Sequence, residues 1–347
     1  MCLACVGISS CRSSHVVIYD MDTKQVVSRI YDDGNWRELI IHAHPDEEIF
    51  VTLQIKGKRE GLRFRKRDKE GKLIEQRDLP YFRFPHPHVR LLSPDKSKMI
   101  AKDFKEVCVL FFHDDAPSEL KTLFRIPEAN AIDSIDWISD NELLIMEWTE
   151  VPDNDPNSSI KFNLVRRVYV YDIRSSERRM ISDLGLGAYC ITLSDDRKFA
   201  AIVFNSNPTR RYPNPAIVRI FDIEKFEFVS EFDIPQQGDT FNYMSVKGTW
   251  LDKGKTLAIY NSLHPEIFFH YDLETGTLSE KRFDVPTWKD CWVMGMYDRY
   301  WVLLKNGGID SWNSTYYLYD TVTGKYTKFN AGGDMCLFAD HYLLGHY

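Results

Sequence analysis

The sequence predicts an all-β protein in which a unit of four strands is repeated seven times around a closed ring. Three observations lead to this prediction. One type of hairpin returns along the whole chain, a second hairpin precedes each copy, and the interval that runs through the chain ends matches the other intervals. We find no long segment with the 3.6-residue apolar period of a helix. Strands therefore account for the fold.

The first repeated hairpin has an apolar strand that ends in Asp, then a polar turn and a second strand. Clear copies are VVIYDMDTKQVVSRI at residues 16–30, VYVYDIRSSERRMI, VRIFDIEKFEFVSEF, FFHYDLETGTLSEKRF and YYLYDTVTGKYTKF. With two looser copies, the marker aspartates are Asp20, Asp68, Asp114, Asp172, Asp222, Asp272 and Asp320. They lie 46 to 58 residues apart, and the interval from Asp320 through the chain ends to Asp20 is 47 residues, so the repeat is circular.

The second hairpin lies before each marker, as in YCITLSDDRKFAAIVF and GTWLDKGKTLAIYN. Two hairpins make four strands, and a period of about 45 to 50 residues with four strands is typical of propeller blades. We therefore predict a seven-bladed β-propeller of four-stranded antiparallel blades. Residues 15–32 form a marker hairpin that no upstream hairpin precedes, and residues 334–347 form an upstream hairpin that no marker hairpin follows, so together they build the closing blade. We expect one domain over residues 1–347, with residues 1–14 as a flexible tail.

The aromatic residue and Asp at the end of the third strand, followed by a Thr-Gly turn in Asp272–Gly276 and Asp320–Gly324, resemble the W-D position of WD40-type propellers. The resemblance spans the whole chain, although no unit has Trp before the marker Asp and the Gly-His pair of that family is missing. The chain is therefore similar to a divergent WD40-like propeller. This resemblance implies a rigid platform for proteins or peptides, and less often a lactonase, a hydrolase accessory domain or a cofactor enzyme.

The composition limits the function classes. A net charge of -7 argues against general affinity for nucleic acid or anionic membranes. No apolar run reaches the length of about 18 residues that predicts a membrane span, and the N-terminus does not have the pattern of a signal peptide. The seven cysteines, several of them in apolar strands, fit a reduced compartment. We expect a cytoplasmic monomer; a truncated lipoprotein leader would instead place the protein outside the cytosol.

The candidate binding residues gather in the connections at one end of the predicted blades, around the mouth of the central channel. The two longest connections, residues 147–162 and 205–215, belong to neighbouring blades; one is acidic and the other is basic. Aromatic and Arg side chains are typical of interaction hot spots, and long loops on a rigid scaffold often carry function. The alternative is that the two loops only neutralise each other. The residues expected to bind a protein or peptide are Trp36, Arg37, His86, His88, Trp148, Arg210, Arg211, Tyr212, Phe241, Tyr243, Trp288 and Trp292.

A basic strand is a further candidate site. Arg63, Arg65 and Arg67 alternate with other residues and so share one face of a strand. Such a face could bind phosphate groups or an acidic partner. The alternative is a solvated outer surface.

Metal and catalytic motifs give weaker signals. The Cys2, Cys5, Cys11 and His15 string has too short a first loop for the usual zinc fingers, and the DNDPNSS segment does not have the Gly and Glu of a calcium loop. We therefore expect no metal and no cofactor. Nucleophile-elbow, P-loop and zinc-protease motifs are missing. We favour a non-catalytic interaction scaffold; the alternative is a lactonase-like hydrolase with His86, His88 and Glu147 or Glu150 at the channel mouth.

Overall fold

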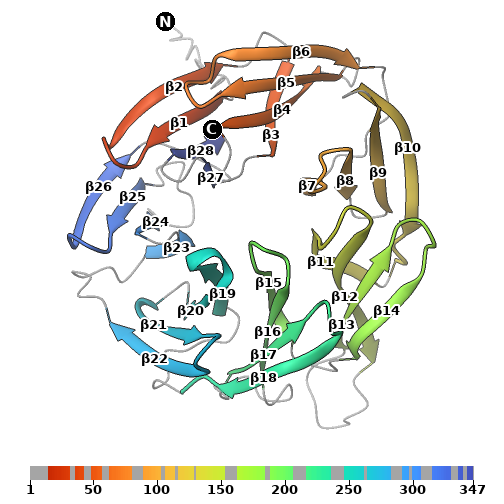
Figure 1. Ribbon diagram of the computed structural model, residues 1–347, viewed down its shortest axis with the longest axis vertical. Helices are drawn as coiled ribbons and strands as arrows, with labels where there is room; N and C mark the ends of the chain where they lie inside the picture. The colour runs from red at the N-terminus through yellow and green to blue at the C-terminus, as the bar shows by residue number, and fades with distance from the viewer. Residues whose placement is uncertain are drawn as a thin grey trace, which may run out of the picture. The chain divides into compact units, whose positions relative to one another are not determined.

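We describe the protein from a computed structural model. The described residues are 15–31, 36–42, 48–56, 62–79, 89–102, 106–113, 116–128, 130–152, 162–183, 188–205, 216–235, 246–261, 264–282, 291–296, 299–305, 315–329, 335–338 and 342–346. Within them, the strands β1 to β28 form seven antiparallel four-stranded sheets, and one short 3-10 helix, η4, covers Asp252–Gly254 (Figure 1). This confirms the predicted all-β class. The chain divides into two compact units.

The first unit holds two sheets and both ends of the chain, over residues 1–83 and 331–347. One sheet has the strand order β2 (Gln25–Tyr31), β1 (His15–Asp20), β28 (Tyr342–His346) and β27 (Met335–Phe338). The other has the order β3 (Trp36–His42), β4 (Ile49–Lys56), β5 (Leu62–Asp68) and β6 (Leu73–Leu79). Strand β1 pairs with β28 from Val16 to Asp20, so the N-terminal and C-terminal hairpins share one sheet, as the circular repeat predicts.

The second unit, residues 84–330, holds five sheets in chain order. The first contains β7 (Val89–Leu92), β8 (Lys98–Lys102), β9 (Glu106–His113) and β10 (Ala116–Arg125). The second contains β11 (Asn130–Trp137), β12 (Glu142–Pro152), β13 (Phe162–Asp172) and β14 (Arg178–Asp183). The third contains β15 (Ala188–Leu193), β16 (Phe199–Asn205), β17 (Ala216–Asp222) and β18 (Glu227–Asp233). The last two contain β19 (Val246–Leu251), β20 (Thr256–Asn261), β21 (His264–Asp272) and β22 (Thr277–Arg282), then β23 (Cys291–Met296), β24 (Tyr300–Lys305), β25 (Thr315–Asp320) and β26 (Lys325–Phe329).

Apolar clusters join each sheet of the second unit to the next one along the chain. Strand β13 shows how one sequence supplies two clusters. Tyr169 and Tyr171 pack with the β7–β10 sheet, whereas Val168 and Val170 pack with the β15–β18 sheet. Because both faces are buried there, residues 168–171 of the strand are an unbroken apolar run rather than an alternating one. Trp137 is 1% exposed in the first of these clusters, and its truncation to Ala would cost about 3–5 kcal/mol.

The marker Asp of the repeat holds the turn after the third strand. The Oδ1 atom of Asp172 accepts hydrogen bonds from the backbone N–H groups of Arg174, at 2.7 Å, and Ser175, at 3.0 Å. The Oδ1 atoms of Asp20 and Asp320 likewise accept hydrogen bonds from the backbone N–H groups two and three residues later. The backbone N–H of Ser175 is the main cause that lowers the pKa of Asp172 below its usual value. These are Asx turns, which explains why Asp recurs there.

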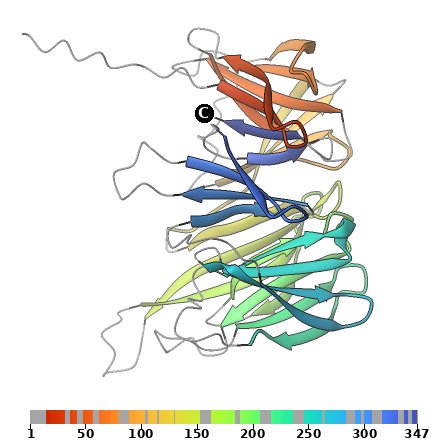
Figure 2. The ribbon, with the colours of Figure 1, turned by 90° about the vertical axis from the view of Figure 1, so that its left-hand side faces the viewer.

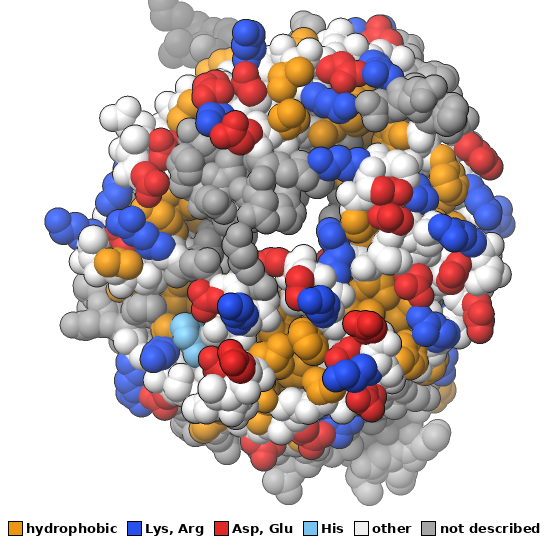
Figure 3. All heavy atoms as spheres, in the orientation of Figure 1, with side chains coloured by type: hydrophobic (Ala, Val, Ile, Leu, Met, Phe, Trp, Pro, Cys, Tyr) orange, Lys and Arg blue, Asp and Glu red, His pale blue; other side chains and the backbone are white. Residues whose placement is uncertain are grey.

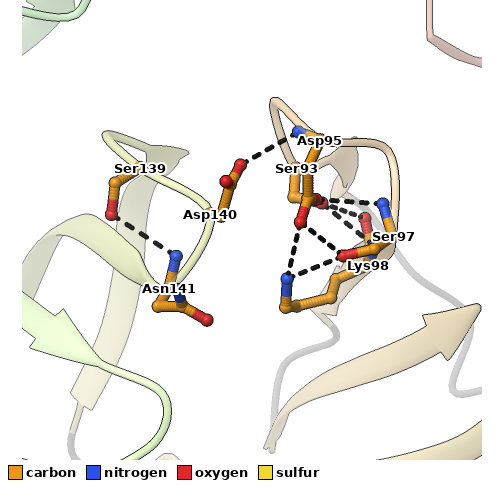
Figure 4. A network of polar contacts seen from close by, with 7 residues as sticks. All are labelled: Ser93, Asp95, Ser97, Lys98, Ser139, Asp140 and Asn141. Atoms are coloured by element: carbon orange, nitrogen blue, oxygen red, sulfur yellow. Dashed lines mark hydrogen bonds and ion pairs between the residues drawn. The ribbon is translucent and has the colours of Figure 1, made fainter.

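The turn between β7 and β8 has its own polar network. This network also reaches the turn between β11 and β12 in the next sheet (Figure 4). Ser93 Oγ donates to Asp95 Oδ1 at 2.5 Å, and Ser97 Oγ and Lys98 Nζ lie 2.7 and 3.1 Å from Asp95 Oδ2. The backbone N–H of Asp95 donates to Asp140 Oδ1 at 2.9 Å. Burial would raise the pKa of Asp95, but the hydrogen bonds lower it well below its usual value. The network thus ties the turns of two successive sheets together.

Candidate interaction surface

The described aromatic candidates occupy equivalent ends of their sheets. Trp36 begins β3 and pairs with Lys56 at the end of β4, and Trp292 near the start of β23 pairs with Leu304. Trp148 of β12 pairs with Ala131 near the start of β11. Each of the three tryptophans therefore lies at the end of its own sheet at which the chain passes from the second strand to the third.

The other predicted partner-binding residues divide into two groups. Arg37 follows Trp36 in β3. The candidates that lie outside the described residues are His86, His88, Arg210, Arg211, Tyr212, Phe241, Tyr243 and Trp288. Cys2, Cys5 and Cys11 also lie outside them. Partner binding by Arg37 and by the His, Arg and aromatic candidates stays a prediction.

The roots of the two long connections belong to sheets that pack face to face. Strand β12 ends at Pro152 and β16 ends at Asn205, and these strands give the connections their first residues. Met146 of β12 and Phe204 of β16 lie in one apolar cluster. Trp148, two residues beyond Met146 on the same face of β12, is partly buried at the end of this junction.

The β12–β13 hairpin is longer than the sheet that contains it. Strand β11 pairs with β12 as far as Thr149, whereas β12 and β13 continue to pair through Pro152 and Phe162. Three further residue pairs correspond to a projection of about 10 Å, at about 3.4 Å per residue. Figure 2 shows these yellow-green strands projecting at the lower left. The β12–β13 hairpin thus extends beyond the end of β11.

An ion cluster lies next to Trp148. The Arg166 Nε atom of β13 is 2.9 Å from Asp133 Oδ2 of β11, with side-chain exposures of 14% and 29%. Because Trp148 lies between Ala131 and Arg166 in the sheet, the Arg166 side chain crosses β12 beside the indole to reach Asp133. We call Lys102, Asp133, Trp148, Glu150 and Arg166 together the Trp148 surface.

Lys102 joins this surface from the neighbouring sheet. Its Nζ atom, at the end of β8, donates a hydrogen bond to the carbonyl oxygen of Ile132. Burial lowers the pKa of the Lys102 ammonium, and the nearby Asp133 carboxylate opposes this effect. No motif in the sequence singles out Lys102, Asp133 or Arg166. One signal for Asp133 is the spacing of Ile132 and Ile135. Both are buried in one cluster, but residues three apart point to opposite faces of a regular strand, so a β-bulge has to lie between them.

Glu147 has a structural environment rather than a reactive one. Its carboxylate accepts hydrogen bonds from Asn130 Nδ2 at 2.5 Å and Tyr169 OH at 2.9 Å, and Arg178 Nη1 lies 3.7 Å away. Burial, with the Glu147 charge as a second cause, raises the pKa of Tyr169. The two oxygens of this buried carboxylate are thus bound by the sheet itself, whereas Glu150 is exposed.

The predicted basic strand is β5, and its arginines bind within their own sheet. Arg63 Nε lies 2.6 Å from Asp78 Oδ1, and Arg65 Nε donates to Gln76 Oε1 at 2.9 Å. Arg67 is only 7% exposed and donates to the carbonyl oxygen of Gly71 at 3.0 Å. The prediction of one open basic face therefore needs a correction at Arg67, because its guanidinium is buried against the turn. On the face seen in Figure 3, acidic and basic side chains are interspersed.

The described residues contain no group of three or more His, Cys, Asp and Glu side chains that could hold a metal ion. Among the same residues, no helix is long and apolar enough to cross a membrane.

Comparison with known proteins assigns the fold. No family model and no curated protein matches the chain. An oligogalacturonate lyase from Vibrio parahaemolyticus is similar with a TM-score of 0.54 and 12% identity, over 95% of this chain and 88% of that chain. An oligogalacturonate lyase in complex with manganese gives a TM-score of 0.52 and 13% identity, over 90% and 83%. The β-propeller domain of the trilobed protease from Pyrococcus furiosus gives 0.52 and 12%, over 92% and 90%. At these identities the similarity concerns the fold alone, and that fold is a β-propeller.

Proposed function

We propose that this chain is a non-catalytic, WD40-like propeller that binds a protein or peptide partner through the Trp148 surface. The proposal includes the closure of the seven sheets into one ring and one domain. The observation that carries it is the partly buried Trp148 beside a charged Arg166, at the root of two long connections. Tryptophan and arginine together are typical of the residues that dominate binding energy.

The environment of Glu147 favours this proposal over the hydrolase alternative. A general base needs a lone pair that faces the substrate, and both oxygens of Glu147 accept hydrogen bonds from within the sheet. The lyase activity in the names of two similar structures belongs to those proteins, since similarity of fold alone does not transfer an activity.

The test is crosslinking of the purified full chain to its partners in a cell extract. We expect Trp148→Ala and Arg211→Ala to lose the crosslinked partner while the thermal unfolding temperature changes little. The matched control is Tyr326→Ala, which removes an aromatic side chain that is 48% exposed on β26. Partner capture that survives both Trp148→Ala and Arg211→Ala would reject the proposal.

A further inference from the structure

We propose that His270 of β21 makes one junction of the molecule sensitive to acid: protonation of its imidazole loosens the packing of the β19–β22 sheet on the β23–β26 sheet. Both sheets belong to the second unit and follow each other along the chain (Figure 1). Three observations support this switch, which is independent of the proposed function. They are the place of the ring in the junction, a buried nitrogen without a hydrogen-bond partner, and the charges around the ring.

The imidazole of His270 stands at one end of a row of rings that crosses the junction. Its centroid lies 4.9 Å from that of Phe268, and the two ring planes make an angle of 66°. Phe268 in turn makes a T-shaped contact with Trp301 of β24, at 4.8 Å and 78°. Phe268 and Trp301 are 3% and 2% exposed in the apolar cluster that joins the two sheets. A change at His270 therefore acts on the contact that holds these sheets together.

One nitrogen of the ring cannot accommodate a proton while the junction is closed. The Nε2 atom of His270 is buried and has no hydrogen-bond partner among the described residues. A neutral imidazole carries one proton, so one of its nitrogens needs no acceptor, whereas an imidazolium carries a proton on both. A buried N–H donor without an acceptor is unfavourable. Protonation therefore favours an open junction in which water reaches this nitrogen.

The charges around the ring also disfavour the imidazolium. Lys281 of β22 pairs with Phe268, and alternate residues of a strand share a face, so Lys281 lies on the same face of the sheet as His270. Asp252 of η4 acts in the opposite direction, and its Oδ2 atom accepts a hydrogen bond from Thr256 Oγ1 at 3.0 Å. Burial is the largest cause that lowers the pKa of His270 below its usual value; Lys281 adds to this effect and Asp252 opposes it.

Other titratable groups of the two sheets on this side keep one charge state between pH 7.5 and 5.5. Tyr260, Tyr317 and Tyr319 pack in or against the same apolar cluster, and phenols are neutral over this range. Hydrogen bonds from Thr275 are the main cause that lowers the pKa of Asp272, so this carboxylate stays charged. Arg299, two residues before Trp301, keeps its positive charge and is bound to Asp320 at 2.9 Å. Among the groups of this paragraph and His270, only the imidazole titrates in this range.

The pH dependence has a defined sign and size. The usual pKa of histidine is about 6.5, and the closed junction lowers it. The stabilising effect of the neutral ring is therefore complete above about pH 6.5 and is lost as the pH falls below that value. If the ring titrates only when the junction is open, the equilibrium constant for opening rises about tenfold by pH 5.5. Partial titration in the closed state makes the rise smaller, so we expect about three- to tenfold.

The test is hydrogen exchange of the full chain at pH 7.5 and 5.5, with each rate divided by the intrinsic rate of an unfolded peptide at the same pH. Peptides from β21 and β24 report on the His270 junction, and peptides from β12 and β16 report on the junction that contains Met146 and Ile202. We expect the three- to tenfold rise in β21 and β24 only. His270→Phe should abolish it, whereas the matched control His264→Gln, on the same strand, should keep it.

If His270→Phe does not fold, His270→Gln takes its place, because glutamine also binds no proton in this range. Rates that do not change with pH in the wild type would overturn the proposal, as would a rise that persists in the folded His270 variant or an equal rise at both junctions. Slower exchange of β21 and β24 in acid would also overturn it, since the imidazolium would then stabilise its contact with Phe268. The partner experiment with Trp148→Ala is unaffected by any of these results.

Discussion

Replacing Gly71 by Ala tests how the β3–β6 sheet packs on the sheet that joins the chain ends. Gly71 has φ +82°, and a Cβ atom there would lie 3.0 Å from Ile18 Cδ1, 3.0 Å from Ser28 Oγ and 3.3 Å from Ile30 Cδ1. Ile18 is 0% exposed and Ile30 8%, so neither side chain has much room to move. Gly324 is the matched control. It has φ +66°, but a Cβ atom there would meet nothing within 4 Å.

Both glycines donate a backbone hydrogen bond of 2.9 Å to the carbonyl oxygen of their marker, Asp68 or Asp320, although Gly71 follows its marker by three residues and Gly324 by four. Alanine in the left-handed region costs about 1–2 kcal/mol at either position. Overpacking against Ile18 and Ile30 adds about 1–3 kcal/mol at Gly71 alone. We therefore expect Gly71→Ala to destabilise the protein by about 2–5 kcal/mol, and Gly324→Ala by about 1–2 kcal/mol.

The assay is urea unfolding followed by tryptophan fluorescence, together with hydrogen exchange of peptides from β1 and β2. Exchange in these peptides should rise in Gly71→Ala and stay unchanged in Gly324→Ala. Equal destabilisation by the two substitutions, with no change in β1 and β2, would refute the packing of Gly71 on Ile18 and Ile30.

Three further predictions concern the closing sheet, acid stability and the buried carboxylate. Deletion of residues 336–347 removes the partner of β1, whose residues Val16 and Ile18 are 0% exposed; we expect earlier thermal unfolding of the whole protein. Hydrogen bonds from Arg299 are the main cause that lowers the pKa of Asp320 from 3.8 to about 2, so this carboxylate stabilises the fold above about pH 4 and loses that effect as the pH falls toward 2. The stability difference between wild type and Arg299→Gln should therefore shrink over that pH range in acid titrations. Tyr169→Phe removes the 2.9 Å donor to buried Glu147, and urea unfolding should show a loss of about 1–3 kcal/mol.

Each of these predictions has a contradicting outcome. If truncation leaves the exchange of residues 84–330 unchanged, the ring is not closed. A constant difference between Arg299→Gln and wild type from pH 6 to 2 would contradict the role of Asp320. A change below about 0.5 kcal/mol in Tyr169→Phe would mean that water replaces the phenol.

The repeat and the pairing of the chain ends could be predicted from the sequence because their causes are local or periodic. Asp172 and Asp320 bind N–H groups only two and three residues away, so the same residue has to recur wherever the same turn recurs. The interval across the chain ends then implied that the first and last hairpins complete one sheet, and β1 pairs with β28.

The Trp148 surface depended on tertiary structure. Lys102, Asp133 and Arg166 come from three strands in two sheets, and no spacing in the sequence relates them. Their contacts exist because packing of the two sheets and one β-bulge bring the side chains together. Arg67 is a second case in which the sequence pattern does not determine what a side chain contacts. Alternation predicts that Arg67 shares one face of the strand with Arg63 and Arg65. It does not say whether that face meets solvent or a turn, and at Arg67 the guanidinium meets the Gly71 carbonyl. Local sequence therefore specifies the repeated strands and turns, whereas contacts between residues far apart in the chain set the burial and the partners of the charged side chains.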